Sequence, residues 1–273
     1  MAITKAEKSV YNDYTKDFKT QKDASYKRIT ELEKKRKEMP RIKGYLAVET
    51  VIELLKIIML DLNMNDASFE ILKIKNEAAL KNARKEFFAV LQKMEELVGD
   101  QVDRSLKENE EYLAAIDRIN PQQMLKIIQR INYVLSTLID RIGETSKWKW
   151  SFVDLQGRVA AVTKNGINFS EVQKYRDPRT EFYRERQQLM TLCKLSLRDA
   201  AQQYRTKYEQ STKVPGDMLK SIEFLSVLRR IHILFGESDE ASRLKTAIDA
   251  MRARLEADEK EKEKEKEKKS GKK

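Results

Sequence analysis

The sequence predicts an all-α fold: elongated antiparallel helical bundles or hairpins, a long basic N-terminal helix and a charged C-terminal tail. Only 8 Gly and 4 Pro occur among 273 residues, so the residues that a turn-rich β fold requires are scarce. Apolar residues recur at helical spacing over long segments. Charged residues make up 36% of the chain and hydrophobic residues 40%, which favours extended helices with a large solvated surface.

Residues 1–43 are predicted to form one basic amphipathic helix, with thirteen Lys and Arg against seven Asp and Glu. We expect Pro40 and Gly44 to end it. Its apolar stripe is only one side chain wide, whereas a bundle helix normally shows a wider one, so we expect a helix that is mostly solvated or that awaits a partner. The stripe consists of Tyr11, Phe18, Leu32 and Met39, with Tyr14 and Ile29 close to the same face.

Residues 44–142 are predicted to form a bundle of four helices with short connections. The first helix, at 45–63, is apolar over more than half of its circumference and should be buried. We expect a turn at 63–66, where Asn65 or Asp66 would cap the second helix.

The later boundaries of this bundle follow from strong local signals. Gly99 suits the left-handed position after the second helix, and a shorter third helix is expected after Asp100. Asn120 followed by Pro121 is a typical helix start. The fourth helix then runs to Gly143.

Residues 143–179 are predicted to be an irregular connector that contains both tryptophans and a short helix at 151–163. Two interpretations of Trp148 and Trp150 stay open. The indoles fill the gap between two helical units, or they form an exposed aromatic anchor for a partner, since tryptophan is frequent at interface hot spots.

Residues 180–255 are predicted to form a second helical unit of three helices. Residues 256–273 form a Lys/Glu-rich tail without an apolar residue after Ala257. Such a segment has nothing to pack with, so we expect it to be solvated and disordered.

The junction Gly236–Ala241 resembles the helix-turn-helix junction of a tetratricopeptide repeat. The resemblance would imply peptide binding on a concave helical face. The chain departs from that pattern at Arg229, His232 and Lys245, and no 34-residue period recurs. A generic helical hairpin is therefore the preferred interpretation.

Two basic segments, 27–43 and 174–186, are candidate sites for nucleic acid or anionic surfaces. Tyr175, Phe182 and Tyr183 could stack on bases, but interleaved carboxylates would repel phosphate. A solvated or internally paired helix face is the alternative. The basic candidates are Lys34, Lys35, Arg36, Lys37, Arg176, Arg179, Arg184 and Arg186.

The composition argues against an enzyme. A single Cys and a single His exclude a disulfide scaffold and a zinc finger, and neither phosphate-binding glycine motif occurs. We expect Cys193 and His232 to be packing residues. No cofactor, metal or catalytic residue is predicted.

No transmembrane segment is expected, because the most apolar stretch, at 51–60, is short and contains two charges. The N-terminus lacks the apolar region of a secretory signal. We therefore expect a cytoplasmic protein, or an exported one if a signal peptide has been removed.

The sequence thus predicts a non-enzymatic helical scaffold or assembly subunit that binds other proteins, or its own copies, through helix faces. A part in a larger filamentous, envelope or motility structure is an extension of this prediction. The alternative is electrostatic binding of nucleic acid or anionic surfaces through the basic segments, which we favour less. The candidate contact residues are Tyr11, Tyr14, Phe18, Leu32, Trp148 and Trp150.

Overall fold

The structure is a computed structural model that describes residues 3–270, without the side chains of 212 and 265–270. Within this range the chain is all-α, with ten α-helices and no strand, as predicted. The helices are α1 (Lys5–Glu38), α2 (Lys43–Leu72), α3 (Glu77–Val98), α4 (Asn109–Ala114), α5 (Pro121–Ile142), α6 (Lys149–Asn165), α7 (Phe169–Lys174), α8 (Tyr183–Lys207), α9 (Pro215–Leu234) and α10 (Ser238–Ser270). A 3-10 turn, η1 (Pro40–Ile42), joins α1 to α2, and a π-helical turn, η2 (Tyr208–Thr212), follows α8.

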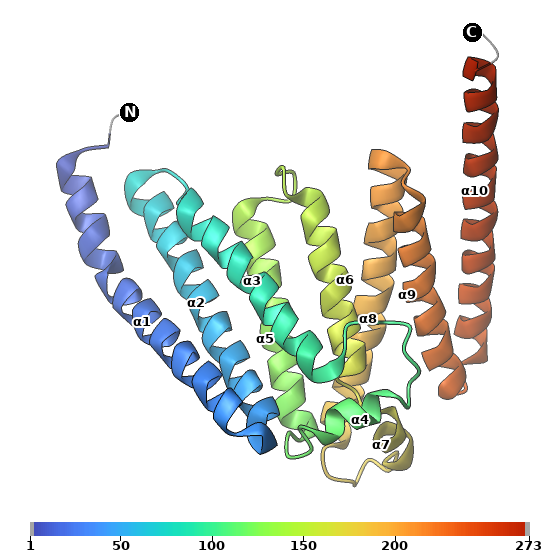
Figure 1. Cartoon of the computed structure of the whole chain (residues 1–273), viewed down its shortest axis with the longest axis horizontal. Coiled ribbons are helices and arrows are strands. Elements are labelled where there is room, and N and C mark those ends of the chain that lie inside the picture. The colour runs from blue at the N-terminus through green and yellow to red at the C-terminus, as the bar shows by residue number, and fades with distance from the viewer. Residues whose placement is uncertain (1–2, 271–273) are drawn as a thin grey trace.

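The long helices form a row that starts with α1 at one end and finishes with α10 at the other (Figure 1). In the middle of the row the packing does not follow chain order, because α2 packs against α5, α3 against α6 and α5 against α8. The short helices α4 and α7 lie together at one edge of the row (Figure 1). One continuous cluster of buried apolar side chains runs from Ala47 to Leu255. The segment predicted as an irregular connector contains α6, whose side chains belong to this cluster, so the core continues through it.

The first helix ends earlier than predicted, and Gly44 does not end it. Met39 caps α1, and Gly44 lies in the first turn of α2. A Cβ atom at Gly44 would lie 2.8 Å from Cγ2 of Ile116 and 2.9 Å from the carbonyl oxygen of Ala115. The glycine therefore permits close packing of α2 against the segment after α4, instead of breaking a helix.

The predicted turn at 63–66 is wrong, because α2 continues through it to Leu72. No Gly or Pro interrupts this stretch, and its polar side chains find tertiary partners. The Oδ1 atom of buried Asn65 accepts the backbone N–H of Asn76 at 3.0 Å. The side chain of Asn76, not that of Asn65 or Asp66, caps α3 by accepting from the N–H of Ala79.

The signals around α5 are confirmed. Asn120 and Gln123 form a reciprocal capping box, with Pro121 in the first turn. Gly99 and Gly143 have φ values of 86° and 102°, a region that favours glycine. The third helix of the predicted bundle is reduced to the six residues of α4.

Two buried polar residues at the end of α6 hold the loop that precedes α4. The Nζ atom of Lys164 donates to the carbonyl of Arg104 at 2.6 Å, and the Nδ2 atom of Asn165 donates to that of Gly99 at 2.9 Å. Burial lowers the pKa of Lys164 to about 8. The helix that the sequence predicts at 151–163 thus extends to Asn165, and both side chains are fully buried.

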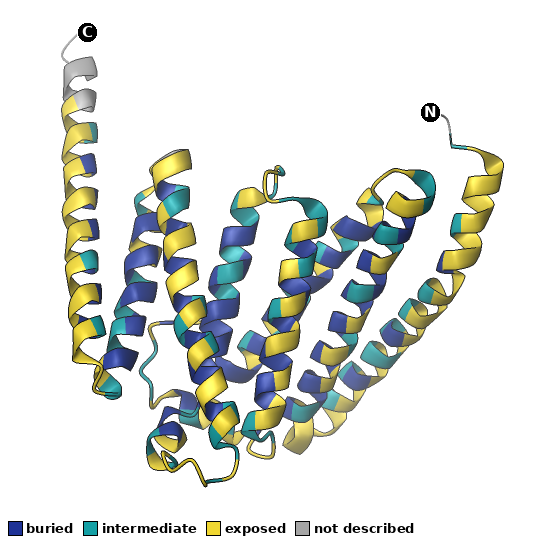
Figure 2. Cartoon of the chain, turned by 180° about the vertical axis from the view of Figure 1, so that it is seen from behind, coloured by how far each residue is buried: buried dark blue, intermediate teal, exposed yellow. Residues whose placement is uncertain are grey.

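The last helix differs from the predicted disordered tail. Within the described residues, α10 is helical through Ser270. Up to Lys264, its buried side is a narrow stripe, and most of the other residues are exposed (Figure 2). The rest of the predicted tail, residues 271–273, lies outside the described residues.

Candidate protein-interaction groove

The candidate contact residues of α1 are distributed over different environments. Tyr14 is 59% exposed and meets the ring of Phe18 edge-on, with 5.7 Å between the ring centroids. Leu32 is fully buried. The hydroxyl of half-buried Tyr11 accepts from the Nδ2 atom of Asn76 at 2.8 Å. Tyr11 and Leu32 therefore face their own chain, whereas Tyr14 and, at the end of the stripe, Met39 are largely exposed.

A polar network attaches the middle of α1 to α2 and α3. Asp61 is fully buried on α2 and accepts from the Nζ atom of Lys22 at 2.5 Å and the Nδ2 atom of Asn82 at 2.6 Å. The hydroxyl of Tyr26 donates to Glu86 at 3.0 Å. We call this set the α1 lock, since it attaches α1 to the bundle in place of a wide apolar seam. Its members are Lys22, Tyr26, Asp61, Asn82 and Glu86.

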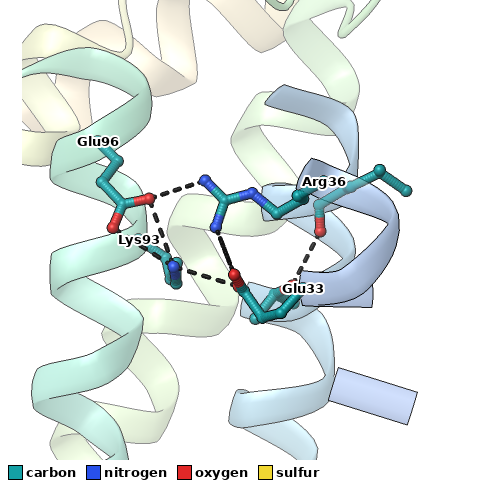
Figure 3. A network of polar contacts seen from close by, with 6 residues as sticks. Glu33, Arg36, Lys93 and Glu96 are labelled. Carbon is teal, nitrogen blue, oxygen red and sulfur yellow. Dashed lines mark hydrogen bonds and ion pairs between the residues drawn. The ribbon is translucent and has the colours of Figure 1, made fainter. Parts of the chain in front are cut away.

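A second set of ion pairs involves the basic end of α1 (Figure 3). Arg36 binds Glu33 and Glu96 at 2.9 Å each, and Lys93 lies 3.2 Å from Glu33. Burial would raise the pKa of Glu33, but hydrogen bonds and charge from Lys93 and Arg36 outweigh it and lower the pKa. Of the four candidate cations at 34–37, Arg36 is therefore engaged within the protein, while Lys34, Lys35 and Lys37 are exposed.

The second basic segment lies elsewhere, between α7 and the start of α8. Arg186 is buried, donates to the carbonyl of Glu181, and lies 4.9 Å from the ring centroid of Tyr175. Arg179 is paired with Asp177 at 2.7 Å. The other two candidates of this segment, Arg176 and Arg184, are exposed.

The two tryptophans lie at the start of a helix. Trp148 is the residue before α6, and Trp150 is in its first turn. Both are half-buried and pack against the apolar core. The guanidinium carbon of Arg84 lies 4.0 Å from the ring centroid of Trp148.

A largely apolar groove lies between the starts of α2 and α5 and has a volume of about 580 Å³. The sequence does not predict it. Ile42 and Ile52 line it and are 39% exposed each. We call it the α2–α5 groove. Its lining residues are Ile42, Tyr45, Leu46, Val48, Glu49, Ile52, Arg118, Ile119, Gln123, Lys126, Ile127 and Arg130.

Tyr45 fixes one wall of the α2–α5 groove. Its hydroxyl donates to Asp117 at 2.6 Å and accepts the backbone N–H of Arg118 at 3.2 Å. The ring is therefore held between α2 and the segment that precedes α5. A preformed wall reduces the ordering cost of binding.

The rim of the groove carries more free positive than free negative charge. Arg118, Lys126 and Arg130 are exposed, and within the described part of the chain none of them forms an ion pair. Glu49, by contrast, is paired with Arg28 of α1 at 2.9 Å. The groove thus combines an apolar floor with three cations that form no ion pair with any described residue.

The amino-acid sequence predicts buried helices over this region but no groove. One signal was available. The first bundle helix is apolar over more than half of its circumference, which is more than one antiparallel neighbour covers.

The single Cys and the single His lie inside the protein. Burial raises the pKa of Cys193, which is fully buried, to about 12. His232 is 4% exposed, and its Nδ1 atom contacts Glu237. Among the described residues, no group of three side chains is arranged to hold a metal ion. Over the same range, no helix combines the length and apolar character needed to cross a bilayer.

Comparison with known proteins gives one match. The model of the TP0443 family matches residues 7–259, so the chain belongs to the TP0443 family. No curated protein and no solved structure matches the chain.

Proposed function

We propose that the protein is a non-enzymatic helical scaffold that binds a partner protein through the α2–α5 groove. The partner segment is an amphipathic helix with acidic residues beside its apolar face. The observation that carries this proposal is the combination of a partly exposed isoleucine floor with three rim cations that form no ion pair among the residues the structure describes.

The shape and apolar character of the groove support a helix as its occupant. The floor follows the first turns of α2 and α5, and Ile42 and Ile52 stand about two and a half to three turns apart along the chain. An amphipathic helix places apolar side chains at comparable intervals along one face. Burying the exposed parts of these isoleucines would contribute about 25 cal/mol per Å² of apolar surface.

The rim supports an acidic occupant. Arg118, Lys126 and Arg130 would face carboxylates of the partner helix, which would raise the association rate and select against basic partners. Since these pairs would remain partly solvated, each adds only about 0.2–1 kcal/mol. Affinity should come mainly from the apolar floor, and selectivity from the rim.

The alternative function is electrostatic binding of nucleic acid or anionic surfaces. It is favoured by Lys34, Lys35 and Lys37, which are exposed on α1. It predicts that affinity falls steeply with the logarithm of the salt concentration. The scaffold proposal predicts a shallow dependence.

The test uses a fluorescently labelled, designed amphipathic helical peptide with Leu on one face and Glu beside it, measured by fluorescence anisotropy. We expect the full-length protein to bind it, Ile52→Asp to weaken binding at least about tenfold, and the double variant Lys126→Glu/Arg130→Glu to weaken it several-fold. The matched control is Ile233→Asp, since Ile233 is a 52% exposed isoleucine on α9. It should bind as the wild type does.

Charge reversal completes the design. A peptide with Lys in place of Glu should bind the wild type poorly and should gain affinity for Lys126→Glu/Arg130→Glu. Equal binding of the acidic peptide to wild type and Ile52→Asp would contradict the proposal. A steep salt dependence of a DNA or RNA oligonucleotide, lost in a Lys34→Gln/Lys35→Gln/Lys37→Gln variant, would support the alternative.

A further inference from the structure

Arg84 on α3 is a largely covered cation without an acidic partner in the described part of the chain. Its guanidinium carbon lies 4.0 Å from the ring centroid of Trp148 and 5.2 Å from that of Phe88. One terminal nitrogen donates to Oγ of Ser151 at 2.7 Å. The Nε atom is inaccessible to solvent and has no hydrogen-bond partner.

The neighbouring Arg158, in contrast, has an acidic hydrogen-bond partner. Arg158 also lies near Phe88, at 5.7 Å from the ring centroid. It donates two hydrogen bonds of 2.6 Å to the carboxylate of Glu95. A covered cation normally has such a partner, so the environment of Arg84 lacks an anion that the environment of Arg158 contains.

Arg84 lines a cavity of about 560 Å³ that can supply the space for this anion. The cavity lies between the start of α3 and the loop from α5 to α6. Both of these segments are at the upper edge of the molecule in Figure 1. It is separate from the α2–α5 groove, which lies at the other end of α5. Its lining residues are Glu77, Leu80, Lys81, Arg84, Ile142, Ser146, Lys147 and Trp148.

The lining defines the chemistry of the ligand. Three cations face one carboxylate, that of Glu77, so the cavity favours an anion. Leu80, Ile142 and the indole of Trp148 form an apolar wall. A small inorganic anion would leave this wall in water, whereas an organic anion would cover it.

We propose that this cavity binds an organic carboxylate. The carboxylate accepts hydrogen bonds from the guanidinium of Arg84 and the ammonium of Lys147, and the aliphatic or aromatic part packs on Leu80, Ile142 and Trp148. Arginine suits this role because its planar donors match the two carboxylate oxygens. Bound in this way, the ligand links α3 to the loop that starts α6.

The test follows the indole N–H resonance of Trp148 by two-dimensional NMR of the ¹⁵N-labelled full-length protein. Trp150→Phe assigns the two indole signals. The probes are hexanoate, its neutral analogue hexanamide, and inorganic phosphate. Hexanoate should shift the Trp148 signal in a saturable way, hexanamide should bind at least about tenfold more weakly because it lacks the charge, and phosphate should bind more weakly than hexanoate.

Two variants and a control locate the site. Arg84→Met keeps the length and apolar contacts of the side chain but removes its charge, and it should weaken hexanoate binding about tenfold. Lys147→Gln alters only an exposed residue, so it leaves folding intact, and it should weaken binding about threefold. Lys85→Gln changes an exposed neighbour on α3 outside the cavity and should bind as the wild type does.

Three outcomes would overturn the proposal. The first is an unchanged hexanoate affinity in both Arg84→Met and Lys147→Gln. The second is equal binding of hexanoate and hexanamide, which would remove the role of charge. The third is phosphate binding as tight as that of hexanoate, which would remove the role of the apolar wall. None of these outcomes depends on whether the α2–α5 groove binds a helix.

Discussion

The two end helices of the row are both long and highly charged, but they are attached by different forces. The buried residues of α1 are Thr15, Ser25 and Leu32. Those of α10 include Leu244, Ile248, Met251 and Leu255. The α1 end relies on the α1 lock and surface ion pairs, and the α10 end relies on an apolar seam.

Two helices with a similar content of charged residues can therefore be attached to the same fold by different interactions. Buried ion pairs are sensitive to the loss of either partner, because the remaining charge is left without compensation. An apolar seam loses free energy in proportion to the side-chain volume that is removed. The two ends should therefore respond differently to mutation, salt and pH.

The largest effect is expected at the α1 lock. Asp61→Ala removes the acceptor of Lys22 and Asn82 and should cost about 4 kcal/mol, within the usual range for breaking a buried pair. Hydrogen exchange should show loss of protection throughout α1 but little change in α8–α10. The control is Asp23→Ala, which alters an exposed carboxylate of α1. Retained protection in α1 of Asp61→Ala would show that the apolar contacts of Leu32 suffice.

A somewhat smaller effect is expected at the α10 end. Ile248→Ala truncates a 5% exposed side chain and should cost about 3 kcal/mol. The loss, measured by urea unfolding, should not depend on salt, whereas the protection of α1 in the wild type should decrease as salt is raised. Leu219→Ala, at a 54% exposed position of α9, is the matched control. A salt-dependent loss at Ile248 would contradict the contrast between the two ends.

The smallest effect is expected at a feature that both ends share, a tyrosine that donates to a carboxylate. Tyr26 donates to Glu86, and Tyr208 donates to Asp258 at 2.7 Å. Tyr26→Phe and Tyr208→Phe should each cost about 1.5 kcal/mol in chemical unfolding. Tyr133→Phe, at a 63% exposed position, should cost nothing measurable.

The pH dependence of this cost follows from the tyrosine pKa values. Burial, the largest cause, raises the pKa of Tyr26 and of Tyr208 from 10.0 to about 12. The folded state therefore retains the phenolic proton longer than the unfolded state. The stability that each tyrosine contributes is complete below pH 10 and is lost as the pH rises towards 12. A difference between wild type and Phe variants that grew above pH 10 would contradict this assignment.

The sequence predicts the fold well where the signals are local. Asn120, Pro121 and Gly143 delimit α5 through capping and a positive φ angle, which depend on the adjacent turn only. For Asn65 the predicted capping role is wrong, because its hydrogen bond is tertiary. It accepts the N–H of a residue eleven positions later, and no local pattern separates that role from helix capping.

The candidate site was harder to predict for the same reason. Arg184 and Arg186 look equivalent in the sequence, yet one is exposed and the other is buried beside Tyr175. One wall of the α2–α5 groove depends on the hydrogen bond between Tyr45 and Asp117, which are 72 positions apart in the sequence. The groove therefore depends on the tertiary packing of distant segments, which no local pattern predicts. Likewise, the missing partner of Arg84 becomes visible only beside the satisfied Arg158.

The outer position of the two end helices has a mechanical consequence. Each is held chiefly by one helix, α1 by α2 and α10 by α9, whereas the inner helices also pack across the chain order, as α2 does on α5 and α5 on α8. A force applied across the chain ends therefore loads the two end helices first, and each can come away before the cross-packed middle is disturbed. Under tension we expect extension in steps that begin at the polar edge, so the molecule would lengthen gradually under load while its middle stays folded.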